Sequence, residues 1–288
     1  MNIISGKELA LSIKQRLAEQ VKELAPKYGR LPNLVVILVG NDPGSKSYVA
    51  GKNKAADFVG YKNTCIHLED TITEQQLLDQ VIALNEDPTV DGILVQLPLP
   101  KHINANRILA TIRRDKDVDG FHPINAADLF QARVSSDTVL PCTPLGIIKM
   151  LKSVNYEIDG KHAVVLGRSN IVGQPVAKLL LNENATVTIC HTHTRNLPEI
   201  TRQADILISA IGVPGFVKAD MVKPGAAVID VGTAFDAQRG KICGDVDFDS
   251  VAPLTSYITP VPGGVGPMTI ACLMENTMSC YLNHVARK

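Results

Sequence analysis

The sequence predicts an α/β protein with two domains, and three observations support that prediction. The chain has 288 residues, a length that suits two domains of ordinary size. Apolar runs typical of buried strands alternate with helical patterns, which favours parallel βαβ units. After a Pro-Cys-Thr-Pro break at residues 141–144, a strand, a glycine turn and a helix follow in succession, as in a Rossmann-like parallel sheet.

Composition narrows the class of protein. Lysine plus arginine and aspartate plus glutamate both number 29, so no basic excess favours nucleic acid as a partner. The six cysteines are scattered without a CxxC pair, which predicts reduced thiols in the cytoplasm and neither a zinc site nor disulfides. We expect no signal peptide, and no run of about 20 apolar residues suggests a membrane span.

The first half alternates predicted helices with predicted strands. Residues 5–8 and 73–76 have capping-box spacing and open two helices. We expect Ser45 to cap a third helix that Gly60 ends, and Pro26 to follow the end of the first helix. The strands are expected at residues 34–39, 62–68 and 91–97.

Tyr48 and Lys52 are the first candidates for chemistry. They are four residues apart on a predicted helix, so both project from one face. The helix follows a buried strand, and open α/β sheets bind ligands at the carboxyl ends of their strands. A phenol beside an amine can act as an acid–base pair, whereas a solvated lysine and a half-buried tyrosine are the plain alternative.

Two further polar residues follow a strand or a sharp turn. Gln96 stands at the end of a predicted strand, where its amide could orient Lys52 or a polar heterocycle. Asp119 precedes Gly120, where the backbone can turn sharply and direct a carboxylate that suits paired N–H groups on a ligand. His122 precedes a proline, and we interpret it as mainly structural.

The second half has the pattern of a nucleotide-binding unit. A helix is expected at residues 146–154, and a strand at 162–167 leads through Gly167 and Gly173 into a helix at 174–182. The spacing of these glycines is not GxGxxG, so an ordinary βα turn is the alternative. Further strands are expected at residues 186–190, 205–212 and 226–232.

The end of the strand expected at residues 186–190 favours NADP over NAD. An NAD site normally has an acidic residue there for the ribose hydroxyls, but this chain has hydroxyls and Arg195 at residues 192–195. Arg168 lies in the glycine turn itself, where it suits a phosphate. His191 and His193 alternate on the predicted strand without an evident third ligand, so we expect no metal.

Six motifs, in order along nearly the whole chain, resemble the bifunctional methylenetetrahydrofolate dehydrogenase/methenyltetrahydrofolate cyclohydrolase family, the FolD type. The last of them, residues 257–269 with sequence YITPVPGGVGPMT, is long and specific. The others are Tyr48-x-x-x-Lys52, residues 96–100 (QLPLP), 117–121 (DVDGF), 141–144 (PCTP) and 167–169 (GRS).

The resemblance implies two α/β domains with a cleft between them. Residues 1–140 plus 270–288 would form the folate-binding catalytic domain and residues 141–269 the NADP-binding domain. The last helix, about residues 269–285, would pack back on the first domain, and two copies would form a homodimer. The activity implied is oxidation of 5,10-methylenetetrahydrofolate with NADP, followed by hydrolysis of the methenyl product to 10-formyltetrahydrofolate.

The resemblance also implies roles for individual residues. Lys52 would be the acid–base group of the hydrolytic step, Gln96 would tune it, Tyr48 would pack against the folate and Asp119 would hold the pterin. The substrate contacts would come from Tyr48, Lys52, Val95, Gln96, Leu97, Asp119 and a segment closing over the cleft, Pro262, Gly263, Gly264, Val265, Gly266 and Pro267. The cofactor contacts would come from Gly167, Arg168, Ser169, Val172, Gly173, His191, Thr192, Thr194, Gly212 and Thr233.

Two departures from the family pattern and two rival functions stay open at this point. Relatives often have His-Ser where this chain has His191-Thr192, and a more polar pair is expected at Thr233-Ala234. One rival is another two-domain NADP-dependent dehydrogenase of a small acid. The other is a non-catalytic NADP sensor, which the set of Tyr48, Lys52, Gln96 and Asp119 disfavours.

Overall fold

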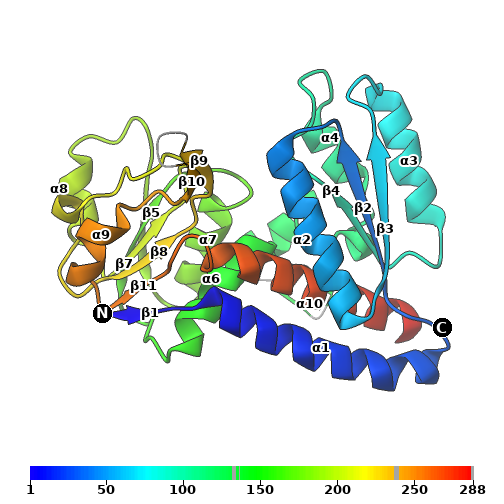
Figure 1. Ribbon diagram of the computed structural model, residues 1–288, viewed down its shortest axis with the longest axis horizontal. Helices are drawn as coiled ribbons and strands as arrows, with labels where there is room; N and C mark the ends of the chain where they lie inside the picture. The colour runs from blue at the N-terminus through cyan, green and yellow to red at the C-terminus, as the bar shows by residue number, and fades with distance from the viewer. Residues whose placement is uncertain (132–133, 136, 237–239, 287–288) are drawn as a thin grey trace. The chain divides into compact units, whose positions relative to one another are not determined.

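The computed structural model describes residues 1–131, 134–135, 137–236 and 240–286. The chain divides into two compact units, each built around a parallel sheet (Figure 1). The three-stranded unit comprises residues 11–140 and 270–288, and the six-stranded unit comprises residues 1–10 and 141–269. The chain therefore passes from one unit to the other after residues 10, 140 and 269.

The first ten residues lie in the six-stranded unit, although we predicted them in the first domain. The reason is a two-residue strand, β1 (Asn2–Ile3), which pairs in parallel with β11 (Tyr257–Ile258). Ile4 continues this register by donating its backbone N–H to the carbonyl of Ile258 at 2.9 Å. A strand this short leaves no periodic pattern in the sequence, so the pairing is set by the distant partner.

The sheet of the three-stranded unit has the order β3-β2-β4, all parallel. Its strands are β2 (Asn33–Val39), β3 (Lys62–Leu68) and β4 (Gly92–Val95). Every residue of β2 is buried, because helices cover both faces of a parallel sheet. The chain leaves β2 toward β3 on one side and later enters β4 on the other, so the carboxyl ends of β2 and β4 form a topological switch point.

Several helices accompany this sheet. They are α1 (Gly6–Tyr28), α2 (Pro43–Val59), α3 (Glu74–Glu86), α4 (Ala105–Thr111), the short 3-10 turn η1 (Arg114–Lys116), α5 (Pro123–Phe130) and α10 (Val265–Ala286). The division between the units falls within α1 and within α10. Helix α2 packs on β2 and β3, while α3 covers the face that carries Val35, Ile37 and Val39.

Several predicted helix ends are confirmed and others are corrected, since α6 (Cys142–Ser153) begins at Cys142 and not at residue 146, and α10 begins at Val265 and not at about residue 269. Thr73 and Gln76 form the expected capping box of α3, and Gly60 ends α2 with φ +83°. Helix α2 is capped by Asp42, not Ser45, because the Asp42 carboxylate accepts the Ser45 backbone N–H at 2.7 Å. Helix α1 runs past Pro26 to Tyr28, so the predicted end there is wrong.

The six-stranded sheet has the order β1-β11-β8-β7-β5-β6 and is parallel throughout. Its four longer strands are β5 (His162–Leu166), β6 (Thr186–Cys190), β7 (Ile206–Ser209) and β8 (Ala227–Asp230), of which β6 forms one edge. After β5 the chain turns to β6 on one side and then to β7 on the other, which places this sheet's switch point between β5 and β7.

The remaining elements of this unit are helical or short. They are α6 (Cys142–Ser153), α7 (Gly173–Asn182), α8 (Leu197–Thr201), η2 (Ala219–Met221), the antiparallel pair β9 (Ala234–Asp236) and β10 (Lys241–Cys243), α9 (Phe248–Val251) and η3 (Ala252–Leu254). Helix α7 packs on β5 and β6, and its first turn follows directly from the glycine turn after β5.

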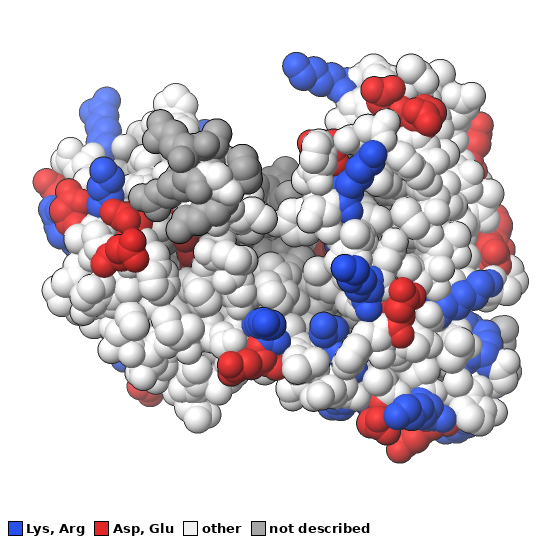
Figure 2. Space-filling view, in the orientation of Figure 1, with Lys and Arg blue, Asp and Glu red and all other residues white. Residues whose placement is uncertain are grey.

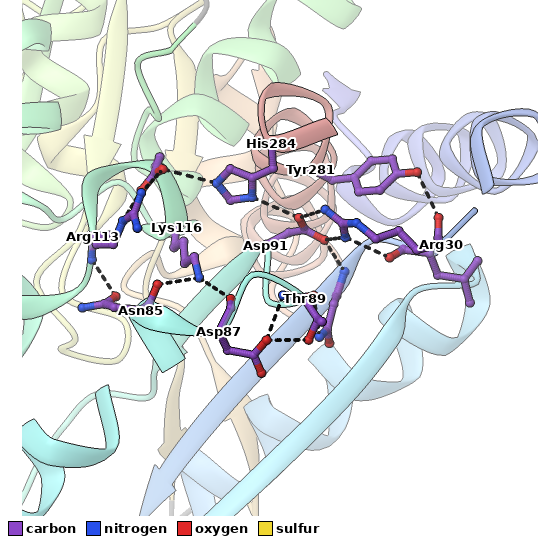
Figure 3. Close-up of polar contacts among 12 residues, drawn as sticks. Arg30, Asn85, Asp87, Thr89, Asp91, Arg113, Lys116, Tyr281 and His284 are labelled. Carbon is purple, nitrogen blue, oxygen red and sulfur yellow. Dashed lines mark hydrogen bonds and ion pairs between the residues drawn. The ribbon is translucent and has the colours of Figure 1, made fainter. Parts of the chain in front are cut away.

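A network of polar contacts ties the end of α10 to the three-stranded unit (Figure 3). Asp91, which precedes β4 and is fully buried, accepts both terminal nitrogens of Arg30 at 2.6 and 2.7 Å. His284 of α10 lies 3.0 Å from Asp91 and 3.4 Å from Asp115. Tyr281 donates to the carbonyl of Arg30 at 3.0 Å. The last two turns of α10 are therefore held by buried charge as well as by packing.

Charge is mixed on the surface. Acidic and basic side chains intermingle on the face shown in Figure 2, in agreement with the formal net charge of zero. All six cysteines are free, as the sequence predicts. None of the helices formed by the described residues is both long and apolar enough to cross a membrane.

Candidate active site

Lys52 and Gln96 meet at the switch point of the three-stranded sheet. Nζ of Lys52 donates to Oε1 of Gln96 at 2.9 Å. Gln96 itself extends the ladder, since its backbone N–H donates to Ile37 of β2 at 2.9 Å, and its side-chain amide donates to the carbonyl of Leu97 at 2.6 Å. These contacts fix the side-chain oxygen of Gln96 toward the lysine. Lys52 is only 6% exposed, so its nitrogen depends on this acceptor for a hydrogen-bond partner.

Tyr48 and Ser45 lie on α2 one and two turns before Lys52. Tyr48 keeps 38% of its surface exposed, which leaves its ring accessible to a ligand. Ser45 is 4% exposed, and its hydroxyl has no hydrogen-bond partner in the described part of the chain. We predicted Ser45 only as a helix cap. Its buried hydroxyl at this position is a polar feature that sequence spacing alone did not reveal.

Asp119 lies in a turn that is joined to β4. Asp117 forms a parallel bridge with Ile93 of that strand, three residues before Gln96. Gly120 has φ +73°, so the sharp turn predicted there is confirmed. The Asp119 carboxylate makes no hydrogen bond to any residue that the structure describes, and it is partly exposed.

His122 has the structural role that we expected. Its ring nitrogen accepts the backbone N–H of Ile124 at 3.2 Å and so caps α5. Burial, with Arg114 nearby, lowers the pKa of His122 and favours the neutral ring that can accept this bond. Val95 is buried within β4, which ends there, two residues earlier than predicted.

The glycine-rich segment at residues 262–267 belongs to the six-stranded unit. Gly263 has φ +108°, and its carbonyl accepts the backbone N–H of Lys7 at 2.9 Å. We expected the whole segment to be a closing loop, but Val265, Gly266 and Pro267 form the first turn of α10. Its contact with folate stays a prediction.

The turn after β5 is shaped by two glycines and one serine. A Cβ on Gly167, whose φ is +111°, would lie 2.4 Å from the carbonyl oxygen of Ala210, and one on Gly173 would lie 2.3 Å from that of Gly167. The Ser169 hydroxyl accepts the backbone N–H groups of Val172 and Gly173 at 3.2 and 3.3 Å. This close approach of backbone around a helix N-terminus suits a pyrophosphate, although the spacing differs from GxGxxG.

The end of β6 carries polar groups without a carboxylate. The Thr194 hydroxyl accepts the backbone N–H of His191 at 2.8 Å, which forms a tight turn, while Arg168 and Thr192 are exposed. His191 and His193 lie just beyond β6, not on it as we predicted. No cluster of metal-ligating side chains occurs in the ranges that the structure describes.

Two buried aspartates that sequence analysis missed organise the neighbouring strand ends. Asp245 is fully buried and accepts from the Ser209 hydroxyl at 3.1 Å and from the backbone N–H groups of Ile211 and Val213 at 2.8 and 2.9 Å. These bonds hold the loop that contains Gly212, which has φ +71°.

Asp230, at the end of β8, has a similar role. Its carboxylate accepts the backbone N–H groups of Gly232, Asp245 and Val246 at 2.9–3.0 Å. Burial raises the pKa of Asp230 to about 6, against the opposing effect of these hydrogen bonds. The loop before Thr233 is thus tied to the strand end and to Asp245.

The strand order and the glycine turn define a Rossmann-type nucleotide-binding protein with a buried lysine site in a second α/β unit. Comparison with protein families agrees. Residues 141–285 match the tetrahydrofolate dehydrogenase/cyclohydrolase NAD(P)-binding domain, and residues 4–119 match the catalytic domain of the same family. The chain therefore belongs to the tetrahydrofolate dehydrogenase/cyclohydrolase family and is an enzyme with both activities.

Individual relatives are similar over nearly their whole length. The chain is 54% identical to "Bifunctional protein FolD" of Listeria innocua, covering 96% of this chain and 95% of that protein. The crystal structure of the bifunctional FolD enzyme from Campylobacter jejuni aligns with a TM-score of 0.95 at 50% identity over 98% and 99% of the chains. The Trypanosoma brucei FolD, solved with NADP and an inhibitor, aligns with a TM-score of 0.94 at 41% identity over 98% and 97%.

Proposed function

We propose that the chain oxidises 5,10-methylenetetrahydrofolate to 5,10-methenyltetrahydrofolate with NADP and then hydrolyses that product to 10-formyltetrahydrofolate. The observation that carries this proposal is the buried hydrogen bond from Lys52 to Gln96 in a chain of this family. A buried lysine at the switch point of a sheet, hydrogen-bonded to a neutral amide, is better suited to proton transfer than a lysine held in a structural ion pair.

The dehydrogenase step needs orientation more than a strong base. NADP supplies a nicotinamide that accepts a hydride, while the two nitrogens that flank the methylene carbon stabilise the cation that remains. The chain's task is to hold the donor and acceptor carbons within about 3–3.5 Å of each other. The turn of Gly167, Ser169 and Gly173 is suited to a nucleotide pyrophosphate, because the two glycines let the backbone after β5 pack tightly against the first turn of α7, whose N–H groups face the end of the sheet.

The cyclohydrolase step requires proton transfer. Water adds to the cationic methenyl bridge, and a proton must then leave the added water and reach a ring nitrogen for the bridge to open. Lys52 carries that proton. A bound cation repels the ammonium form and favours the neutral amine, while Gln96 keeps Nζ directed at the same place.

Folate binding is assigned to the residues around this pair. Tyr48 offers an exposed aromatic face for stacking, and Val95 and Leu97 flank Gln96. The Asp119 carboxylate is suited to accept hydrogen bonds from two N–H groups of the pterin, because no described residue forms a hydrogen bond with it. Pro262, Gly263, Gly264 and the first turn of α10 are the other residues proposed to bind folate.

Arg168 is proposed to select NADP over NAD. It is exposed beside the glycine turn, and the end of β6 carries Thr192 and Thr194 in place of an acidic residue that would repel a 2′-phosphate. His191, Gly212 and Thr233 complete the proposed cofactor contacts.

We further propose that the enzyme is a cytoplasmic homodimer without a nucleic-acid partner. Six free thiols fit a reducing compartment, and the balanced charge offers no basic field for nucleic acid. Light scattering on the purified chain tests the dimer, and a mass of one chain at micromolar concentration would contradict it.

One assay tests the two proposed reactions together. With 5,10-methylenetetrahydrofolate and NADP, the absorbance of the methenyl product should rise and then decay as the formyl product forms. A matched reaction with NAD should be much slower. Formation of NADPH with a methenyl product that decays only at the uncatalysed rate would contradict the second activity.

A further inference from the structure

A buried carboxylate closes the turn between β4 and α5. Asp117 is 2% exposed, and no proposed chemical step uses it. Its Oδ1 accepts the backbone N–H groups of Gly120 and Phe121 at 3.1 and 3.2 Å. Its Oδ2 accepts the backbone N–H of His122 at 2.8 Å and Nδ2 of Asn125 at 2.9 Å. One side chain therefore satisfies three consecutive backbone donors.

Asp119 lies inside the ring that these bonds close. On one side, Gly120 takes a φ of +73° that its hydrogen bond to Asp117 stabilises. On the other side, the carbonyl of Val118 accepts Nδ2 of Asn276 from α10 at 2.9 Å. The backbone on both sides of Asp119 is thus fixed, whereas its own carboxylate has no hydrogen-bond partner in the described parts of the chain.

The residues that lead into the 117–122 turn are also held in place by hydrogen bonds. Lys116 is 3% exposed, and its Nζ donates to the carbonyls of Leu84, Asn85 and Asp87 at 3.0, 2.8 and 2.6 Å, which caps the end of α3 (Figure 3). The bridge of Asp117 to β4 holds the next residue. Because this approach is fixed, the direction of Asp119 depends on how the turn from residue 117 to 122 is closed.

We propose that Asp117 is a positioning residue for folate binding, whose carboxylate closes the 117–122 turn and thereby presents Asp119 to the pterin. This inference rests on the proposed role of Asp119. Without an acceptor at position 117, three buried or half-buried N–H groups must find other partners, and the turn loses its single conformation. Folate would then have to reorder the turn on binding, which lowers its affinity without changing the proton transfer at Lys52.

The substitution Asp117→Asn tests this role, since it keeps the shape but replaces one accepting oxygen with a donor. We expect the KM for 5,10-methylenetetrahydrofolate to rise about tenfold, with kcat and the KM for NADP changed less than about twofold. Asp87→Asn is the matched control. Oδ1 of Asp87 accepts the backbone N–H and hydroxyl of Thr89 in a turn of the same unit, and no kinetic constant should change there.

A double-mutant cycle with Asp119→Asn separates positioning from general stability. If Asp117 acts through Asp119, Asp117→Asn should raise the folate KM little further once Asp119 is replaced. A full additional tenfold rise in the double variant, or an equal rise in the KM for folate and for NADP, would overturn the positioning role. An unchanged folate KM in Asp119→Asn alone would contradict the proposed function of Asp119 itself, and with it this inference.

A milder variant covers the case in which Asp117→Asn does not fold. Asn125→Ala removes one of the two donors to Oδ2 of Asp117 and leaves the three backbone bonds in place. We expect a rise of about threefold in the folate KM that again vanishes in the Asp119→Asn background. The same rise in both backgrounds would overturn the proposal.

Discussion

Nζ of Lys52 and Oε1 of Gln96 are 2.9 Å apart, which joins the middle of α2 to the residue that follows β4. The two residues are 44 positions apart in the sequence, and the parallel pairing of β2 with β4 brings them together. A neutral acceptor next to a buried amine orients the nitrogen without adding a charge that would keep it permanently protonated.

Changing the acceptor to an acid tests that arrangement. Gln96→Glu places a carboxylate beside Lys52, which stabilises the ammonium form and should lower the cyclohydrolase rate at neutral pH by about tenfold or more. The dehydrogenase should lose less, because hydride transfer needs orientation more than a base. Steady-state rates of both reactions on one preparation measure this. Equal losses in the two activities would show that Gln96 acts only in folate binding.

Arg168 provides a test of cofactor choice. Arg168→Ala removes the exposed guanidinium beside the glycine turn, so the Kd for NADP should rise by about tenfold or more, while the Kd for NAD changes little. Isothermal titration with each nucleotide gives both constants. Lys178→Ala, on the helix that follows the turn, serves as a charge-matched control. Equal weakening of NADP and NAD in Arg168→Ala would contradict the assignment.

Gly173 provides a test of the proposed nucleotide-binding turn between β5 and α7. A methyl group at this position would lie 2.3 Å from the carbonyl oxygen of Gly167, so Gly173→Ala must push the turn and α7 apart. We expect a loss of about 1–3 kcal/mol in the free energy of unfolding and weaker binding of both nucleotides. Gly266→Ala, whose added methyl group would meet no atom within 4 Å, is the control for stability and nucleotide binding only, because Gly266 belongs to the proposed folate-binding segment. Unchanged nucleotide affinity in Gly173→Ala would exclude close backbone contact there.

The end of α10 should respond to pH. The carboxylates of Asp115 and Asp91 raise the pKa of His284, against the effect of burial, and the same two carboxylates pair with Arg113 and Arg30. A histidine whose pKa is raised on folding adds stability that is complete below its unfolded pKa of about 6.5 and is lost as pH rises through the folded value.

His284→Gln therefore has a pH-dependent cost. Its loss in unfolding free energy should be about 1 kcal/mol at pH ~5.5 and smaller at pH ~9, because the native histidine loses its proton as the pH rises through its folded pKa. Urea unfolding of both proteins at the two pH values measures the difference. A loss of equal size at both pH values would mean that packing alone, and not the charge of His284, holds the helix end.

The sequence predicted the strands well where burial imposes a continuous apolar run. β2 and β5 match their predicted ranges to within a residue, because a parallel strand covered on both faces reads as a continuous apolar run. β3 and β6 match as well, although both are largely exposed edge strands whose ranges follow from the alternation of strands with helices. β1 could not be predicted, since two residues carry no periodicity and β11 alone determines their pairing.

The predicted cap of α2 was wrong because two neighbouring residues can both cap a helix. Ser45 and Asp42 can both cap a helix, and the carboxylate takes the position because Pro43 suits the first helical turn. The structural roles of Asp117, Asp230 and Asp245 could not be predicted for another reason. Each binds backbone N–H groups whose positions depend on the folded loops, and an aspartate in a loop carries no sign of burial in its sequence.

The most direct test of the mechanism is the fate of the methenyl product in Lys52→Met. Methionine fills a similar volume but carries no proton, so the absorbance of the methenyl compound should rise with NADPH and then persist. We expect the cyclohydrolase rate to fall at least about hundredfold, with substantial dehydrogenase activity retained. Decay of the methenyl absorbance at a rate close to that of the unmodified enzyme would contradict the role of Lys52 as the proton carrier.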